Sequence, residues 1–334
     1  MSRLIHTVAA LAALGLAAGC SSAPELHDAP VAGVTSRSPV SGSPFWVDPA
    51  SPAVQQIQTW EREGRKGDAG LLRQIADQPA ALWPAGEIDP GPAVRAATAS
   101  AGRQGRTSLF VAYDIPHRDC GQHSAGGAAD ADEYRAWIGK FAEALGDARA
   151  IVVLEPDAVA HIVDGCTPGE YQEERERLLS EAVVRLKRQS GTKVYVDAGN
   201  PSWIRDPGRL VEPLKRAGVE RADGFSLNVS NFQTDAVTKE YGVRLSRELG
   251  GKHFVVDSSR NGNGPLSGTW CNPPGRALGT RPTTDTGEAA LDAYLWIKRP
   301  GASDGPCEGG PAAGRWWPEY ALELARNSRS DTGR

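Results

Sequence analysis

Residues Ala150–His161 read AIVVLEPDAVAH, and the interpretation of the whole chain starts from this stretch. Four apolar residues, Ile151–Leu154, stop at the tripeptide Glu155-Pro156-Asp157. A short apolar run that is cut off by a proline indicates a buried strand that ends in a loop. Two carboxylates therefore stand where a strand leaves the core, which in an α/β fold is a frequent place for a functional site.

Similar apolar runs, separated by amphipathic segments, recur on both sides of this strand. We expect strands at Ala80–Trp83, Ser108–Tyr113, Ile151–Leu154, Lys193–Val196, Gly224–Leu227, His253–Val256 and Ala293–Ile297. We expect helices at Ala53–Glu63, Pro92–Ala101, Asp132–Leu145, Pro168–Arg188, Leu210–Ala217, Asp235–Leu249 and Trp317–Arg326. This regular alternation predicts a parallel sheet with helices outside it.

Two common α/β folds lack their sequence signals. No Gly-x-Gly-x-x-Gly motif follows any predicted strand, and the chain has no P-loop. We therefore predict an α/β fold of the TIM-barrel-like kind, a distorted parallel β/α barrel of seven strands. Such a barrel places its active-site cleft at the C-terminal ends of the strands.

The residues that follow the predicted strands are mainly acidic or amide-bearing. They are Asp114, Glu155, Asp157, Asp197, Asn228, Asp257 and Lys298. Neither a nucleophilic Ser or Cys beside a His nor the Gly-x-Ser-x-Gly elbow of esterases accompanies them. Glycoside hydrolysis needs a carboxylic acid to protonate the leaving oxygen and a carboxylate to act on water, so this set favours that chemistry.

Composition sets wider bounds on the class of protein. The chain has 334 residues, of which 40% are hydrophobic and 23% charged, as in ordinary soluble globular proteins. The formal net charge is −4 and no long basic run occurs, so nothing favours a nucleic acid or an anionic membrane surface as partner.

The N-terminus has the pattern of a targeting segment. The apolar run Val8–Ala18 is too short for a permanent membrane span and is typical of a signal peptide. It ends at Ala17-Ala18-Gly19-Cys20, which resembles a bacterial lipoprotein cleavage box; an ordinary secretory signal is the alternative. We expect a signal peptide at 1–20 with lipid on Cys20, a flexible tether at 21–43, a folded domain at 44–328 and a disordered tail at 329–334. The protein would then be exported, either extracellular or membrane-anchored on the cell surface.

Export makes disulfides the expected state of the remaining cysteines. Apart from Cys20, the chain contains Cys120, Cys166, Cys271 and Cys307, which allow three connectivities. Pairing neighbours in sequence gives Cys120–Cys166 and Cys271–Cys307. A zinc site is the alternative, but the spacing lacks CxxC pairs and nearby His partners.

A set of motifs in this order resembles one known family. They are Tyr113-Asp114-Ile115-Pro116-His117-Arg118-Asp119-Cys120, His123-Ser124-Ala125-Gly126-Gly127-Ala128, Glu155-Pro156-Asp157, Asp197-Ala198-Gly199, Ser259-Arg260-Asn261-Gly262, Trp270-Cys271-Asn272-Pro273-Pro274-Gly275 and Leu295-Trp296-Ile297-Lys298 followed by Asp304-Gly305. Together they are similar to the family 6 glycoside hydrolases, which are inverting β-1,4-glucanases. The resemblance covers roughly Phe45 to Arg326.

This resemblance implies roles for the acidic residues. Asp157 matches the general acid, which needs a raised pKa to hold its proton near neutral pH. Asp119 matches a neighbouring carboxylate that raises this pKa and guides water, and Asp304 matches the residue often proposed as base. Tyr113 would lie beneath the distorted sugar.

The resemblance also implies the sugar contacts. Trp46, Trp203 and Trp270 are candidate platforms for sugar rings, while Asp197, Asn228 and Lys298 would bind glucose hydroxyls. Arg118 would be a partner of the acidic cluster. Asn200 stands where the family commonly has His, and it would keep a weakened sugar contact. No metal or organic cofactor is needed for this chemistry.

Two interpretations of the function follow from these matches. The first is an exported, monomeric endo-β-1,4-glucanase, because the connections are compact and show no long insertions that would roof a cleft. The second is a glucan-binding or cell-envelope protein with weakened catalysis. It is suggested by Asn200 and by Ala302, which stands where the family commonly has a sugar-binding Glu.

Overall fold

The computed structural model describes residues 43–86 and 89–328. Within these residues one sheet has six strands, in the order β1-β2-β3-β4-β5-β6. Their bounds are β1 Ser108–Ala112, β2 Ala150–Leu154, β3 Thr192–Asp197, β4 Gly224–Leu227, β5 His253–Asp257 and β6 Leu291–Leu295. All neighbouring pairs are parallel, so the carboxyl ends of the strands lie along one edge of the sheet.

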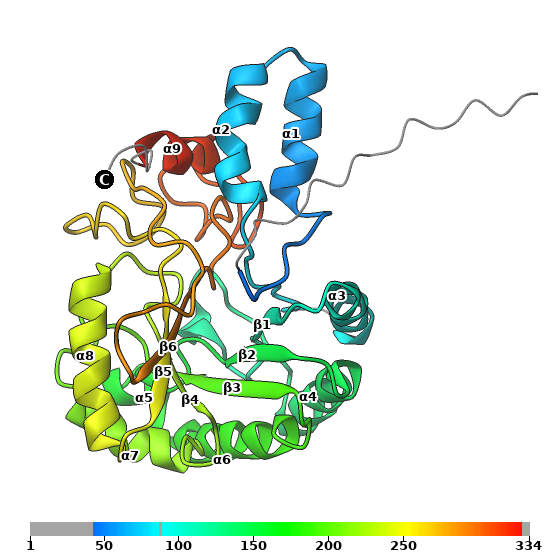
Figure 1. The fold of residues 1–334 in the computed structure, drawn as a ribbon. Helices are drawn as coiled ribbons and strands as arrows, with labels where there is room; N and C mark the ends of the chain where they lie inside the picture. The colour runs from blue at the N-terminus through cyan, green and yellow to red at the C-terminus, as the bar shows by residue number, and fades with distance from the viewer. Residues whose placement is uncertain (1–42, 87–88, 329–334) are drawn as a thin grey trace, which may run out of the picture. The chain divides into compact units, whose positions relative to one another are not determined.

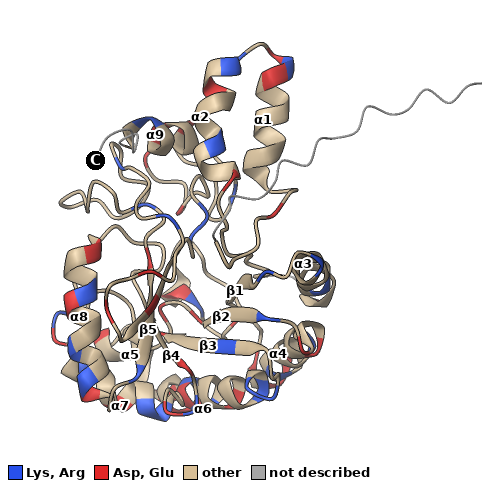
Figure 2. Cartoon of the chain, viewed as in Figure 1, with Lys and Arg blue, Asp and Glu red and all other residues tan. Residues whose placement is uncertain are grey.

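Six helices of the described residues flank the sheet; the first precedes β1, and the others lie between consecutive strands from β1 to β5 (Figure 1). These are α3 Gly91–Arg103, α4 Ala131–Leu145, α5 Ala160–Asp164, α6 Gly169–Leu186, α7 Gly208–Arg216 and α8 Asp235–Glu248. The remaining helices, α1 Pro52–Arg62, α2 Lys66–Ala76 and α9 Pro318–Asn327, share a separate apolar cluster around Trp60 and Leu72. Figure 2 shows basic and acidic residues interspersed along α7 and α8.

The strands are apolar on both faces, which is why they appear as continuous hydrophobic runs in the sequence. Phe110, Val152 and Val194 pack with the flanking helices in the larger core cluster. Their neighbours along the strands point the other way, so that Val111 and Val153 pack with Phe45 in a second cluster. Because strand side chains alternate, every strand except β4 contributes to both clusters.

One of the seven predicted strands, Ala80–Trp83, which is the first in chain order, is not a strand in the structure. Only Leu82 forms a bridge, with Phe110 of β1, while the N–H of Ala81 donates to the carbonyl of Trp296 just beyond β6 (2.9 Å). The segment thus contacts both edges of the six-stranded sheet. Prolines at positions 79 and 84 bound it, and because proline has no N–H to donate, the pairing stops there.

Two smaller differences concern element bounds. The last strand, β6, covers Leu291–Leu295, two residues before the predicted Ala293–Ile297. Helix α2, Lys66–Ala76, is absent from the sequence prediction because Gly67, Gly70 and its polar residues weaken the helical pattern. It forms because its apolar face packs on α1 and α9.

Several sequence predictions fall outside the described residues. They are the signal peptide at 1–20, the lipid site at Cys20, the tail at 329–334 and all of the tether at 21–43 except Ser43. Among the helices of the described part, none is long and apolar enough to cross a membrane.

Candidate active site

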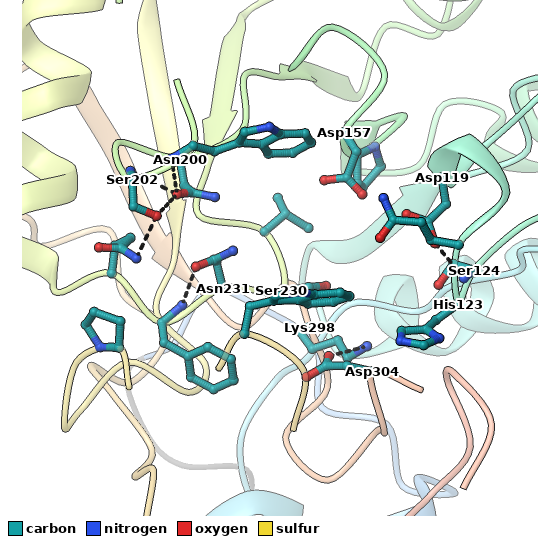
Figure 3. A pocket seen from close by; sticks show the side chains of 18 of the residues that line it. Asp119, His123, Ser124, Asp157, Asn200, Ser202, Ser230, Asn231, Lys298 and Asp304 are labelled. Atoms are coloured by element: carbon teal, nitrogen blue, oxygen red, sulfur yellow. Dashed lines mark hydrogen bonds and ion pairs between the residues drawn. The ribbon is translucent and has the colours of Figure 1, made fainter. Parts of the chain in front are cut away.

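The loops at the carboxyl ends of the strands enclose a cavity of about 930 Å³. Every strand is followed by residues that line it, which places the cavity where the barrel prediction expected a cleft. Most of the predicted site residues lie there: Tyr113, Asp119, Asp157, Asn200, Trp203, Trp270, Lys298 and Asp304. Figure 3 shows Asp157 and Asp119 on one part of the wall, with Lys298 and Asp304 on another.

Asp157 faces this cavity from the loop after β2. Its φ of 71° and the φ of 47° at Glu155 are left-handed, a conformation that non-glycine residues adopt rarely. The backbone N–H of Asp157 donates to Asp197 Oδ2 (2.9 Å), which fixes the turn. Glu155 consequently points into the protein, whereas Asp157 lies at the cavity.

The surroundings of Asp157 favour its protonated form. Burial raises the pKa of its carboxyl well above the ordinary value, and the negative charges of Asp197 and Asp119 raise it further. The positive charge of Lys298 acts in the opposite direction without reversing the shift. Asp157 thus has the raised pKa that a proton-donating carboxyl group needs.

Asp304 stands in the opposite electrostatic environment. Its Oδ2 pairs with Arg260 Nη1 (2.9 Å) and accepts the N–H of Asn272 (3.0 Å), and its Oδ1 lies 3.2 Å from Lys298 Nζ. Burial alone would raise the pKa of Asp304, but the charges of Arg260 and Lys298 bring it below the ordinary value. The two cations therefore favour the ionised form of Asp304 at this wall.

Asp119 is held by a tight loop after β1. Its φ is 54° and its Oδ2 accepts the N–H of Ser124 (2.6 Å). The adjacent Cys120 is bonded to Cys166, which follows α5, so this disulfide ties the loop of Asp119 to the segment behind Asp157. Gly127 closes the loop with φ 91°, where a Cβ would lie 2.0 Å from the carbonyl oxygen of Ile115.

Three carboxylates at strand ends are buried and bind backbone N–H groups instead of facing the cavity. Glu155 accepts the N–H groups of Asp114 and Ile115, and burial raises its pKa to about 7. Asp257 accepts four N–H groups, from Ser230, Ser259, Ile297 and Lys298. Each carboxylate thus joins the loops of neighbouring strands.

Asp197 is the third of these, and here the sequence prediction differs from the structure. Its Oδ2 accepts the N–H groups of Asp157 (2.9 Å) and Gly199 (3.0 Å), and its Oδ1 accepts Ser226 Oγ (3.0 Å). The side chain is fully buried and does not line the cavity, and burial raises its pKa to about 6. Because both oxygens of Asp197 are already bonded within the protein, the structure does not support a direct contact between Asp197 and a glucose hydroxyl.

Three further predicted site residues do not line the cavity. Trp46 is 5% exposed and packs in the larger core cluster. Asn228 is buried, and its side chain bonds to Gln233 and to the carbonyl of Asp257. Arg118 donates to the carbonyl of Tyr113 (2.6 Å) and lies 3.7 Å from Asp114, so it is a partner of the acidic segment, as predicted.

Aromatic side chains do line the cavity. Trp270 is 54% exposed and contacts His123, with ring centroids 5.7 Å apart. Trp203 is held by a hydrogen bond from its Nε1 to Asp164 (2.8 Å). Tyr113 lies edge-on to Trp83 at 5.7 Å, and burial raises its pKa well above the ordinary value, so its hydroxyl stays protonated.

Polar residues around Asn200, most of them not selected by the sequence analysis, also line the cavity. Asn200 Oδ1 accepts Ser202 Oγ (2.8 Å), and Ser202 Oγ in turn accepts Gln233 Nε2 (3.0 Å). Trp83, His161, Asp164, Ser230, Asn231 and Gln233 also line the cavity. Ser230 belongs to the tripeptide Asn228–Ser230, which follows β4 as Asp157 follows β2. The sequence analysis selected only Asn228 of this loop, and the position after a strand is the signal that could have pointed to Ser230 as well.

The four cysteines form the predicted pairs, Cys120–Cys166 and Cys271–Cys307. Each disulfide has a histidine close to its sulfur atoms, His161 and His123 respectively. Among the described residues, these are the groups of Cys, His and acidic side chains that come close enough together to hold a metal ion. Their sulfur atoms are engaged in disulfide bonds, so they lack the thiolates that a zinc site of this kind requires.

Comparison with known proteins agrees with this geometry. Residues 40–328 match the model of the glycosyl hydrolases family 6. The chain is 45% identical over 294 residues to endoglucanase A of Cellulomonas fimi, covering 87% of this chain and 62% of that protein. It is 41% identical over 337 residues to endoglucanase 1 of Streptomyces halstedii, covering 97% and 99%.

A solved structure gives the same result. The endoglucanase Cel6 of Mycobacterium tuberculosis, determined in complex with methyl-cellobiosyl-4-deoxy-4-thio-β-D-cellobioside, superposes with a TM-score of 0.80. The two share 42% sequence identity, and the match covers 86% of this chain and 98% of that chain. The acidic cavity, the six-stranded parallel sheet and these matches together establish that the chain belongs to glycosyl hydrolase family 6.

Proposed function

We propose that this chain is an endo-β-1,4-glucanase that cleaves internal bonds of cellulose or soluble β-glucan with inversion at the anomeric carbon. The main support is the contrast at the cavity between Asp157, whose pKa is raised, and Asp304, whose pKa is lowered. Inverting hydrolysis needs one protonated and one ionised carboxyl group at the same time.

In this mechanism Asp157 donates its proton to the leaving glycosidic oxygen. Asp304, whose ionised form is favoured by Arg260 and Lys298, is the candidate base that draws a proton from the attacking water. An inverting enzyme keeps its two carboxyl groups roughly 6.5–9.5 Å apart to leave room for that water. Asp119 raises the pKa of Asp157 and orients the water, and Tyr113 supports the sugar that distorts toward the oxocarbenium-like state.

The cavity lining supports a glucan as substrate. Trp203 and Trp270 present flat rings against which the C–H faces of a pyranose can stack. Lys298 and the amide nitrogen of Asn200 are available to sugar hydroxyls. The amide oxygen of Asn200 is already bonded to Ser202. Outside the lining, Arg118, Asp197 and Asn228 bind backbone groups of the loops that carry these residues. Trp46 packs in the larger core cluster.

The substitution at Ala302 has a structural setting that limits its effect. Ala302 is buried, forms an antiparallel bridge with Trp316 and does not line the cavity. A missing carboxylate at this place therefore leaves the wall formed by Asp304 and Lys298 intact, so we expect catalysis to be retained. The names of the related endoglucanases support the endo mode of action.

The remaining parts of the proposal concern the cell. A signal peptide at 1–20, lipid attachment at Cys20 and the tether at 21–43 would hold a catalytic domain, 44–328, outside the cytoplasm, where disulfides persist. We propose that the protein acts there as a monomer on soluble or cell-surface glucan.

The deciding experiment measures reducing-sugar release from barley β-glucan and carboxymethylcellulose while NMR follows the product anomers. We expect α-anomers from the wild type and almost no release from Asp157→Asn. Asp285→Asn, a change of the same kind at an exposed position outside the cavity, is the control. Binding of glucan without release by the wild type would instead support the glucan-binding alternative.

A further inference from the structure

A second pocket lies on a different part of the molecule from the catalytic cavity. It has a volume of about 530 Å³ and is lined by Pro52, Gln55, Gln56, Thr59, Arg315 and Trp316. It shares no lining residue with the catalytic cavity. Its size falls within the range of about 300–1,000 Å³ that is usual for small-ligand sites.

Two glutamines supply amide groups to this lining. Gln55 donates from Nε2 to the carbonyl of Ala50 (2.8 Å), which leaves its Oε1 as an acceptor at the pocket. Gln56 Oε1 accepts the indole N–H of Trp316 (3.4 Å), which leaves the amide nitrogen of Gln56 as a donor. Paired amide donors and acceptors match the vicinal hydroxyls of a sugar ring.

Trp316 adds a flat apolar surface, and Arg315 adds a cation. The guanidinium of Arg315 is exposed and has no hydrogen bond or ion pair within residues 43–86 and 89–328. No acidic side chain lines the pocket, so a cationic ligand finds no counter-charge there. An aromatic ring beside amides and a single guanidinium fits an uncharged polyhydroxylated ligand, whose C–H face stacks and whose hydroxyls bond.

The position of the pocket connects it with the catalytic loop. The N–H of Ser303 donates to the carbonyl of Arg315 (2.9 Å), and Ala302 bridges to Trp316. Asp304 follows directly in this segment and lines the catalytic cavity. The strip of chain from 302 to 304 therefore separates the two pockets.

We propose that this pocket, bounded by α1 and Trp316, is a second binding site for a β-1,4-glucan chain. It would hold part of a long substrate on the enzyme while another part occupies the catalytic cavity. The inference rests on the proposed function in one respect, the identity of the glucan, because both sites would meet the same polymer.

The test uses NMR of the tryptophan indole N–H signals in the full-length Asp157→Asn protein during titration with cellotetraose. Trp316→Phe and Trp203→Phe identify the two reporter signals. We expect both signals to shift, because both sites bind the sugar. In Gln55→Ala/Arg315→Ala, the affinity reported by Trp316 should fall about fivefold to tenfold, the loss expected for one or two hydrogen bonds. The affinity reported by Trp203 should stay unchanged.

The matched control is Gln58→Ala, which removes an exposed glutamine side chain from the same helix outside the pocket. It should leave the response of Trp316 as in the parent protein. A Trp316 signal that stays fixed while Trp203 shifts would overturn the second site and leave the catalytic proposal standing. Fixed signals at both tryptophans, together with no sugar release by the wild type, would instead reject glucan as the ligand of either site.

Discussion

Asp157 and Asp304 line the same cavity, yet their surroundings shift the pKa values of their carboxyl groups in opposite directions. Asp157 is placed among other carboxylates, so burial and the charges of Asp197 and Asp119 raise its pKa. Asp304 is equally withdrawn from water but is paired with Arg260 and Lys298, and its pKa is lowered. The comparison teaches that burial alone does not assign a role to a carboxyl group; the sign of the nearest charges does.

The largest effect should come from removing the proton donor. We expect Asp157→Asn to lower kcat on β-glucan by about 10²–10⁴-fold, the usual contribution of a general acid. The loss should be much smaller on 2,4-dinitrophenyl cellobioside, because its leaving group departs without protonation. Stopped-flow or steady-state rates on both substrates measure this, with Asp285→Asn as the control. An equal loss on both substrates would contradict the assignment of Asp157 as the acid.

The next effect concerns the charge that keeps Asp304 ionised. Lys298→Met removes a cation 3.2 Å from Asp304 Oδ1, so the pKa of Asp304 should rise. Activity then needs a higher pH to keep this group ionised, and the acid limb of the kcat/KM profile should move upward by about 1 unit or more. Lys66→Met, at an exposed position of α2, is the matched control. An acid limb that stays in place would show that Asp304 does not control it.

A smaller shift should appear on the alkaline side. Asp119→Asn removes a negative charge that raises the pKa of Asp157, so this pKa should fall. The proton of Asp157 is then lost at lower pH, and the alkaline limb of the kcat/KM profile should move downward. The asparagine oxygen can still accept the N–H of Ser124, which limits structural change. An unchanged or upward-shifted alkaline limb would speak against this coupling.

The smallest effect concerns a carboxyl group that binds backbone and not the cavity. Burial raises the pKa of Glu155 from 4.5 to about 7, so the folded protein resists its ionisation. Its contribution to stability is full below pH 4.5 and is lost as the pH rises through about 7. Between about pH 5.5 and about pH 8 the free energy of unfolding of the wild type should therefore fall by about 2 kcal/mol because of this group. The Glu155→Gln variant should not show this fall, because glutamine does not titrate.

Urea unfolding of both proteins at the two pH values measures this difference. The readout is the change in unfolding free energy with pH, not its absolute level, because the glutamine also alters the hydrogen bonds to Asp114 and Ile115. Parallel pH dependences in the two proteins would show that Glu155 is already ionised in the fold at low pH.

The periodic pattern of the sequence was sufficient for most of the fold. Mainly apolar runs of four to six residues predicted every one of the six strands, because a strand buried on both faces is largely apolar. The pattern was wrong at Ala80–Trp83, where an equally apolar run is bounded by prolines and pairs through a single bridge. It also missed α2, which is stabilised by packing on distant segments.

By itself the sequence determined which chemical groups stand at the strand ends and, through motifs resembling a known family, which of them were candidates for the active site. Only the tertiary structure decided which carboxylates face the cavity and which bind backbone N–H groups. Asp157 and Asp197 both follow strands as acidic residues, and nothing local distinguishes them. The difference arises because Asp197 meets N–H groups from two loops, while a left-handed turn directs Asp157 to the cavity; both conditions depend on residues far apart in the chain.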